Sequence, residues 1–584
     1  MLPPVLRGCH ALGLETPVMS KGSNRTPQAM RWVAYTGMVV PAVLLMILAW
    51  HPETAWLIRM QCRLLFSSRD TYVALREWYV QTPRAPEPEP EWFRVRLEEV
   101  VRQHPEDYLI QLSWRLQRGA PSEVDLGDLL PRFGSRPALL AHVLRYDTVK
   151  RVRIQRVEEW ALYPPSQRPN AQSVVPSSPE DLSAYDRIAA EGERVDPDNL
   201  YFPLMRAVGL FAAHRDKEAL AAVRRASRKP RWEDYTREET EAGLYLLETA
   251  FGKSSSISTF AKSYAVVEPH WTGIRSVARM VRYLAHEKEK EGKWHEAADI
   301  RLAMLHCASR IRAQARSSIG ALVAVAVEDV VIVSSHSARR PNETAEQRRQ
   351  RNRQQFVLSL RTMGRDMDAD WVRREFAAAD ASRTILRAGV EPQRWLSMPL
   401  KLVRAWTVNM LLLFLFWGTF LLWLVYLVVA HTSLRQGMAP YIVLLATVLV
   451  AGVLMVLSPW ADFPARTMVM LAEMAKWAEF QPEWVVVSPL IFRTATAMAI
   501  AFLLLMIVTA IGIWGLVRAQ EPNVALVEGV RRGGLPIAGV LLMLYLFSVW
   551  HTMRLESAWQ TDLHLQQLHA GKYYAAQLGT MWPP

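Results

Sequence analysis

The run LLLFLFWGTFLLWLVYLVV at Leu411–Val429 lies in the stretch from Trp406 to Trp550, around which this 584-residue chain is organised. A helix that crosses the hydrocarbon core of a bilayer, about 30 Å thick, needs roughly 20 mostly apolar residues. Four stretches here meet or approach that length, and a fifth lies upstream: Ala405–Ala430, Tyr441–Leu457, Ala495–Val517, Leu535–Trp550 and Trp32–Trp50. We therefore expect a multi-pass membrane protein with an anchor at 32–50 and a four-helix transmembrane block at 405–551.

The basic residues beside these stretches predict how the chain is oriented, because cytoplasmic flanks carry an excess of Lys and Arg. Residues 1–31 form a basic tail that we expect in the cytoplasm, whether the chain starts at Met1 or at Met19. Alternation then places residues 51–404 and the tail 552–584 outside the cytoplasm. The expected location is the plasma membrane, which is the inner membrane if the Arg-, Ala- and Trp-rich composition reflects a bacterial source.

The net charge of +13 is concentrated in one segment that faces only Glu343 and Glu346. Its basic members are Arg339, Arg340, Arg348, Arg349, Arg351 and Arg353. Two interpretations stay open: a solvated helical face, which we favour, or a contact with lipid headgroups or an anionic polymer. We do not expect a nucleic-acid partner, because this segment lies outside the cytoplasm in the expected topology.

Helical periodicity dominates the residues between the anchor and the transmembrane block, which predicts an all-α fold. Residues 51–90 read as a helix followed by a proline-rich extended spacer, and residues 91–400 as a large extracytoplasmic helical domain. The apolar run Ile319–Val333 contains Glu328 and Asp329, so we expect a buried core helix there and not a membrane span. Further on, 466–480 reads as an amphipathic helix on the outer surface.

Small residues recur where two short antiparallel helices would have to approach closely. After Asp196-Pro197-Asp198-Asn199 they are Ala207, Ala219 and Ala226, and in Leu284–Leu305 they are Gly292 at a turn and Ala297. This pattern resembles the tetratricopeptide-type (TPR-like) helical repeat. The resemblance implies an α-solenoid whose concave surface binds a protein or peptide. Alanine-rich helical hairpins of no particular family would show the same pattern.

Catalytic and metal-binding motifs such as GxSxG, HExxH, GxxxxGK and CxxC are missing from the sequence. His564 and His569 are five residues apart and fit a surface helix, while His270 beside Trp271 reads as an ordinary loop or cap pair. The cysteines Cys62 and Cys307 read as small buried residues. We therefore expect no catalytic residue, no metal site and no cofactor, so that the protein is not an enzyme.

The expected function is that of a membrane-anchored interaction or scaffold protein. Its partners would be the lipid bilayer and proteins, either extracytoplasmic ones or other membrane subunits. The alternative is a non-catalytic subunit of a membrane transport or export complex. The expected spans carry threonines but no buried charge, which disfavours a proton-driven carrier.

Overall fold

The computed structural model describes residues 89–117, 124–163, 177–265, 268–333, 342–389, 397–431 and 522–584, with a few single positions before residue 89. Within these ranges the regular structure is helical, apart from one isolated bridge between Asn199 and Arg231, so an all-α fold is confirmed for them. The chain divides into two compact units. We call them the helical domain (described parts of residues 89–408, with 550–584) and the apolar unit (409–431 and 522–549).

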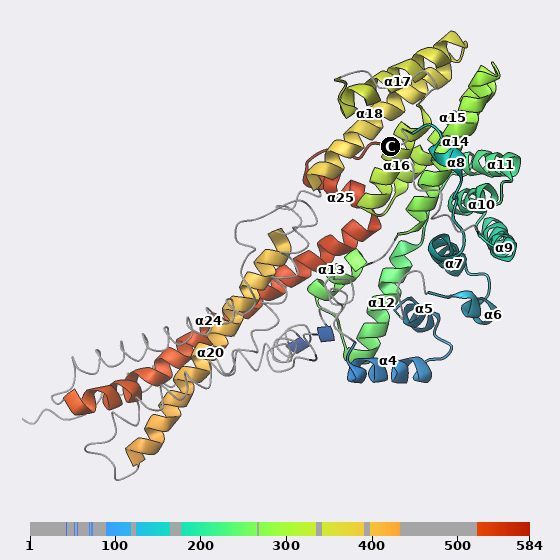
Figure 1. Cartoon of the computed structure of the whole chain (residues 1–584). Helices are drawn as coiled ribbons and strands as arrows, with labels where there is room; N and C mark the ends of the chain where they lie inside the picture. Colours follow the sequence, from blue (N-terminus) through green and yellow to red (C-terminus); the bar gives the residue numbers. More distant parts are fainter. Residues whose placement is uncertain are drawn as a thin grey trace, which may run out of the picture. The chain divides into compact units, whose positions relative to one another are not determined.

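The helical domain begins with helices that pack in neighbouring pairs (Figure 1). In chain order they are α4 (Glu91–Gln103), α5 (Tyr108–Leu116), α6 (Leu130–Phe133), α7 (Pro137–Lys150), α8 (Val157–Trp160), α9 (Pro179–Val195), α10 (Tyr201–Ala212), α11 (Asp216–Ser227) and α12 (Thr236–Phe251). A short 3₁₀ turn, η1, spans Gly127–Leu129. The N-cap of α5 is Asp107, whose carboxylate accepts a hydrogen bond from the Ile110 N–H.

The second half of the domain contains its longest helices together with shorter ones. They are α13 (Ser256–Ala265), α14 (His270–Lys290), α15 (Trp294–Gln314), α16 (Ser318–Val331), α17 (Ala345–Thr362), α18 (Asp366–Gly389) and α25 (Ala570–Gln577). Helix α16 confirms the buried helix expected from Ile319–Val333. The Glu328 side chain on it is fully buried, 3.5 Å from the equally buried Arg312.

Three helical hairpins share one turn geometry: α10/α11, α14/α15 and α17/α18. Each turn has three residues, and its middle residue has a positive φ: 57° at His214, 75° at Gly292 and 74° at Gly364. The backbone hydrogen bonds also match, since the N–H after each middle residue donates to the carbonyl five residues before it. A buried alanine follows five residues after each middle residue, at Ala219, Ala297 and Ala369. A small side chain there lets the second helix approach the first.

The chain after residue 550, which includes the C-terminal segment 552–584, belongs to the helical domain. Ala570, Tyr574 and Ala575 on α25 lie in the main hydrophobic core, where α25 packs on α16 and α18. A Cβ on Gly389 of α18 would lie 2.3 Å from Cγ of Tyr574, so the two helices meet there. Gly571 lies within α25, and its missing side chain makes room for the Trp582 ring.

The apolar unit contains parts of two long helices, α20 (Ser397–His431) and α24 (Pro522–Leu568). Their portions Ser397–Leu424 and Gly533–Leu568 are long and apolar enough to cross a membrane. Both extend beyond the expected spans, and α24 continues without a break past Trp550. The spans expected at 32–50, 441–457 and 495–517, the amphipathic helix at 466–480 and the spacer up to residue 88 lie outside the described residues.

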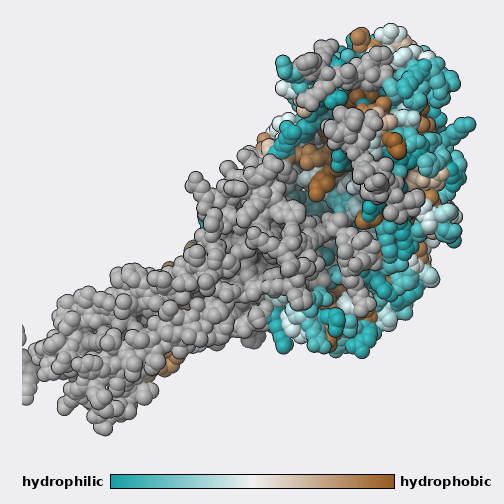
Figure 2. All heavy atoms as spheres, in the orientation of Figure 1, coloured by the Kyte–Doolittle hydropathy of each residue, from teal (hydrophilic) through white to brown (hydrophobic). Residues whose placement is uncertain are grey.

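Large apolar side chains are exposed along both helices of the apolar unit. They are Trp417, Leu421, Leu424, Val540, Met543, Leu544 and Phe547. By contrast, hydrophilic residues cover most of the coloured surface of the helical domain in Figure 2, with only small hydrophobic patches between them. Exposed apolar surface of this density is typical of a region that contacts lipid or another protein.

Candidate functional site

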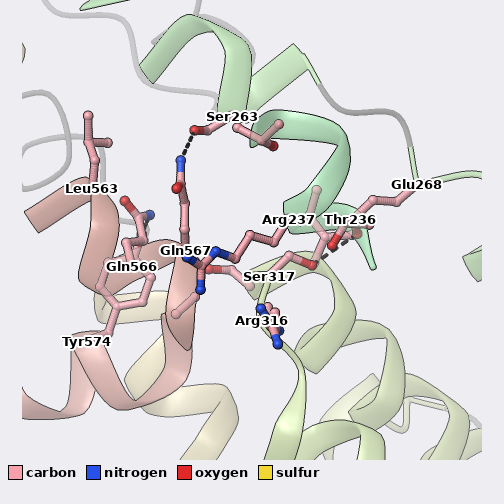
Figure 3. A pocket seen from close by; sticks show the side chains of 14 residues that line it. Thr236, Arg237, Ser263, Glu268, Arg316, Ser317, Leu563, Gln566, Gln567 and Tyr574 are labelled. Carbon is pink, nitrogen blue, oxygen red and sulfur yellow. Dashed lines mark hydrogen bonds between the residues drawn. The ribbon is translucent and has the colours of Figure 1, made fainter. Parts of the chain in front are cut away.

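A pocket of 220 Å³ opens in the helical domain, where four separate segments of the chain meet. Its lining comes from α12, α13, the residues around the start of α16, and the α24–α25 region (Figure 3). The lining residues are Thr236, Arg237, Thr240, Ser263, Glu268, Arg316, Ser317, Ser318, Ile319, Leu563, Gln566, Gln567, Ala570 and Tyr574. Many of these side chains can donate or accept hydrogen bonds, although most of the surface that they expose to the pocket is apolar, so the pocket suits a ligand with a few polar groups.

One side of the pocket is built around Glu268, which Trp271 and Ser317 hold in place. The same carboxylate oxygen, Oε2, accepts hydrogen bonds from the Trp271 indole N–H and from the Ser317 hydroxyl, the latter at 3.0 Å. Ser317 is also the N-cap of α16, since its side chain accepts from the Gly320 N–H. Gly320 lets the Trp271 ring approach, because a Cβ there would lie 2.6 Å from Cζ2 of Trp271.

The Glu268 carboxyl titrates far above the usual range of a glutamate. Burial of the group, together with the nearby Asp234 carboxylate, raises the pKa of Glu268 to about 7. The hydrogen bonds from Trp271 and Ser317 oppose this shift but do not cancel it. Glu268 therefore exchanges a proton near neutral pH, which ordinary surface glutamates do not do.

The opposite side of the pocket carries a cation and two amides. The Nε atom of Arg237 donates to Glu241 at 2.6 Å, and in Figure 3 the Arg237 side chain extends toward the middle of the pocket. The Gln567 side chain donates from Nε2 to the Ser263 hydroxyl at 2.5 Å, and that of Gln566 to the Tyr574 hydroxyl at 2.6 Å. Each amide keeps its carbonyl oxygen as an acceptor.

Behind the pocket lies a buried charge network centred on Arg145, whose side chain is fully buried. It donates to Glu239 at 2.7 Å and to the backbone carbonyl of Asp234. His270 is also fully buried, with Nε2 3.5 Å from the Asp234 carboxylate. Burial lowers the pKa of His270, so the ring is neutral at pH 7. The interpretation of His270 as an ordinary loop or cap residue is therefore wrong, because the ring is part of the core.

The residues expected at helix contacts lie in the interior or at a turn. Ala207, Ala219 and Ala226 are each 0% exposed, Ala297 is 1% exposed, and Gly292 is the left-handed residue of the α14/α15 turn. None of them reaches the pocket, so they shape the scaffold that holds it.

The described part of the arginine-rich segment forms the first half of α17, and its side chains face carboxylates. Arg351 lies 2.7 Å from Glu343, while the buried Arg353 lies 2.9 Å from Asp329 and 2.7 Å from Asp380. Arg353 thus joins three helices instead of lying on a solvated face. A cavity of 410 Å³ beside them is lined by Arg348 and Arg349 but also by carboxylates. Arg339 and Arg340 lie outside the described residues, and the anionic contact stays a prediction.

Two further sequence interpretations concern potential metal ligands. His569 is the N-cap of α25, with Nδ1 accepting from the Lys572 N–H at 3.1 Å and Nε2 lying 2.7 Å from the Ala313 carbonyl. One ring nitrogen therefore caps α25 and the other contacts α15, so His569 lies at a helix contact and not on a surface helix. In the described ranges no three side chains of the metal-ligating types cluster. Cys307 is a buried free thiol, as expected.

Sequence reasoning missed the pocket because no local motif marks it. Glu268 stands in an ordinary AVVEPHW stretch, and Arg237 and Gln567 lie on helices rich in other polar residues. The one usable signal was Ser317-Ser318-Ile319-Gly320, which has the form of a helix N-terminus. No family model, curated protein or solved structure matches this chain.

Proposed function

We propose that this protein is a membrane-anchored interaction protein whose helical domain binds a partner outside the bilayer. The observation that carries the proposal is that, within the described residues, the helical domain continues into apolar helices at two places in the chain. The domain residues Ser397–Val408 begin α20, and the domain residues 550–568 end α24. Covalent continuity with apolar helices suits a domain that acts while it is retained at a membrane.

The three matching hairpins support a repeat-like scaffold for this platform. Each pairs two antiparallel helices across the same three-residue turn, with a buried alanine at the same offset. Stacked hairpins of this kind bury a continuous core and leave an extended surface for protein partners. We infer a TPR-like α-solenoid, as the sequence resemblance implies, with the pocket as a second and smaller recognition site.

Two measurements test the proposal. Reporters active only outside the cytoplasm should work when fused after Pro90, Ala285 or Pro584, and should be silent after Met30, Gln436 or Pro522. Purification of the full chain in a mild detergent should then recover an extracytoplasmic protein in a fixed ratio. Activity of the reporter at Gln436 would contradict the five-span arrangement, and recovery of the chain alone after crosslinking in cells would contradict a protein partner.

A second candidate function is a non-catalytic subunit of a membrane transport or export complex. It is favoured by the origin of the pocket lining, since Leu563, Gln566 and Gln567 lie on the helix that also contains the apolar stretch from Gly533. A ligand in the pocket would therefore contact the same helix, α24, that contains this apolar stretch. Recovery of a stoichiometric ATPase or channel subunit in the same purification would favour this second function over the first.

A further inference from the structure

Glu268 is the one carboxylate that lines the pocket, and among the described residues no basic side chain pairs with it. Its Oε2 atom takes the hydrogen bonds from Trp271 and Ser317, whereas its Oε1 atom has no donor in the described part of the chain. Two other acidic residues near the pocket have basic partners, because Glu233 pairs with Arg316 and Glu241 with Arg237. The pocket therefore contains one carboxyl group whose Oε1 atom a ligand can still contact, and whose negative charge a cationic ligand would stabilise.

The charged groups near Glu268 favour the binding of a cation to its carboxylate. Arg145 is shared between Glu239 and the Asp234 segment, and His270 beside Asp234 is neutral. With Glu268 ionised, three carboxylates face one arginine in this buried region. An isolated buried carboxylate is costly, so the site favours either a proton or a bound cation.

Arg237 supplies the opposite polarity across the same pocket. Its Nε atom is held by Glu241, but its two terminal nitrogens have no partner in the described ranges. A guanidinium with free N–H groups on one edge matches a carboxylate in a two-point contact. Thr240, Gln566 and Gln567 also line the pocket, and in Figure 3 the two glutamines lie on the side away from Glu268.

We propose that this pocket binds a small amino acid, with its ammonium group on Glu268 Oε1 and its carboxylate on the outer edge of Arg237. The 220 Å³ volume accommodates a ligand several times larger than a water molecule, whose share of liquid volume is about 30 Å³. The amide and hydroxyl groups favour a short polar side chain. The aliphatic members of the lining are Ile319, Leu563 and Ala570, and its remaining charged residue, Arg316, pairs with Glu233. This ligand site is independent of the protein partner proposed above.

Calorimetric titration of the full chain in mild detergent tests this assignment. The probes are L-serine and L-glutamine, compared with methylamine, which has only the ammonium end, and sodium acetate, which has only the carboxylate end. We expect one or both amino acids to bind in the micromolar to millimolar range, at least tenfold more tightly than either single-ended probe. Binding at pH 6.5 should also release protons, seen as a heat that depends on the ionisation enthalpy of the buffer, because the ammonium group displaces the proton of Glu268.

Two charge-removing variants, each with a matched control, complete the experiment. Glu268→Gln and Arg237→Gln should each weaken amino-acid binding at least tenfold, and the former should abolish the proton release. The exposed residues Glu180 and Arg187 provide controls, since Glu180→Gln and Arg187→Gln should leave binding unchanged. Arg237 is only half-buried on α12, so its variant keeps the test valid if Glu268→Gln does not fold. Acetate or methylamine binding as tightly as the amino acids, no binding by any probe, or an unchanged affinity in Arg237→Gln would overturn the proposal.

Discussion

The carboxylate of Glu556 accepts a hydrogen bond from the backbone N–H of Ser256 at 2.6 Å, although the two residues are 300 positions apart in the chain. The Ser256 hydroxyl donates in return to the backbone carbonyl of Glu556 at 3.2 Å. Ser256 is the first residue of α13, whose N–H groups have no partner within the helix. The C-terminal part of α24 therefore supplies the cap of a helix in the middle of the sequence.

Loss of this cap should destabilise the domain. Glu556→Leu leaves the buried Ser256 N–H without its acceptor, at a cost of about 1–3 kcal/mol. Glu556→Gln keeps a carbonyl oxygen in the same place and should cost less. Thermal unfolding of the full chain in detergent measures both variants, and equal melting temperatures for the two would show that the hydrogen bond contributes nothing.

The contact of Gly320 with Trp271 predicts that a larger residue at position 320 lowers the stability of the domain. Gly320→Ala places a methyl group where the Trp271 ring now lies, at about 1–3 kcal/mol, of which the better helix propensity of alanine offsets up to about 1 kcal/mol. Trp271→Phe removes the ring atoms concerned. The double variant should therefore lose less free energy of unfolding than the two single variants lose together. If the two losses simply add, there is no direct clash.

Protonation of Glu268 predicts that the stability of the native chain depends on pH differently from that of Glu268→Gln. Because its pKa is raised to about 7 in the folded chain, its contribution to stability is fully present below pH 4.5, the ordinary value, and is lost as pH rises through 7. Glu268→Gln removes this dependence. Relative to the native chain, the variant should gain about 1–3 kcal/mol between pH 4.5 and pH 8, after allowance for solvent screening. Parallel stability curves in urea would contradict the raised pKa.

Replacing the alanines that follow the hairpin turns with larger residues should destabilise the domain. Ala219→Leu and Ala369→Leu each force extra methylenes into a contact between two helices, at about 1–3 kcal/mol. The exposed Lys217 lies on the same helix as Ala219, and Lys217→Leu should change stability by about 0.5 kcal/mol or less. Both alanine variants should therefore melt several degrees lower than Lys217→Leu. If all three melt alike, the hairpins are not closed at these residues.

Truncation of the buried Arg145 should be among the most damaging single changes. Arg145→Met leaves Glu239 buried without a cation, which typically costs about 3–5 kcal/mol. Replacing both members, as in Arg145→Met with Glu239→Gln, removes the uncompensated charge and should recover part of that loss. A double variant no more stable than Arg145→Met would show that packing of the arginine, and not charge compensation, stabilises this region.

Several features could be predicted from the sequence alone because their cause is local. The apolar runs that became α20 and α24 are long enough to span a bilayer whatever they pack against. Glu328 and Asp329 marked α16 as a core helix, since charge at a bilayer centre is expensive. Gly292 and Ala297 marked one hairpin by the spacing of a turn residue and a small residue. Gly364 and Ala369 have the same spacing, which was not recognised.

Other features depend on contacts between distant segments and were therefore decided by the tertiary structure. Helix α24 continues past Trp550 because the polar residues there form helix as readily as the apolar ones before them. The C-terminal α25 joins the core because Tyr574 fills the space beside Gly389, and neither residue indicates the other in the sequence.

The pocket shows the same division most clearly. Hydrophobic periodicity determined that this chain forms helices, because each helix must bury one face. It could not determine that Arg237, Glu268 and Gln567 would meet, since their separation in the sequence is large and no local rule couples them. Only the packing of α12, α16 and α24 brings these charged and polar groups together, and burial there gives Glu268 a pKa that the sequence does not encode locally.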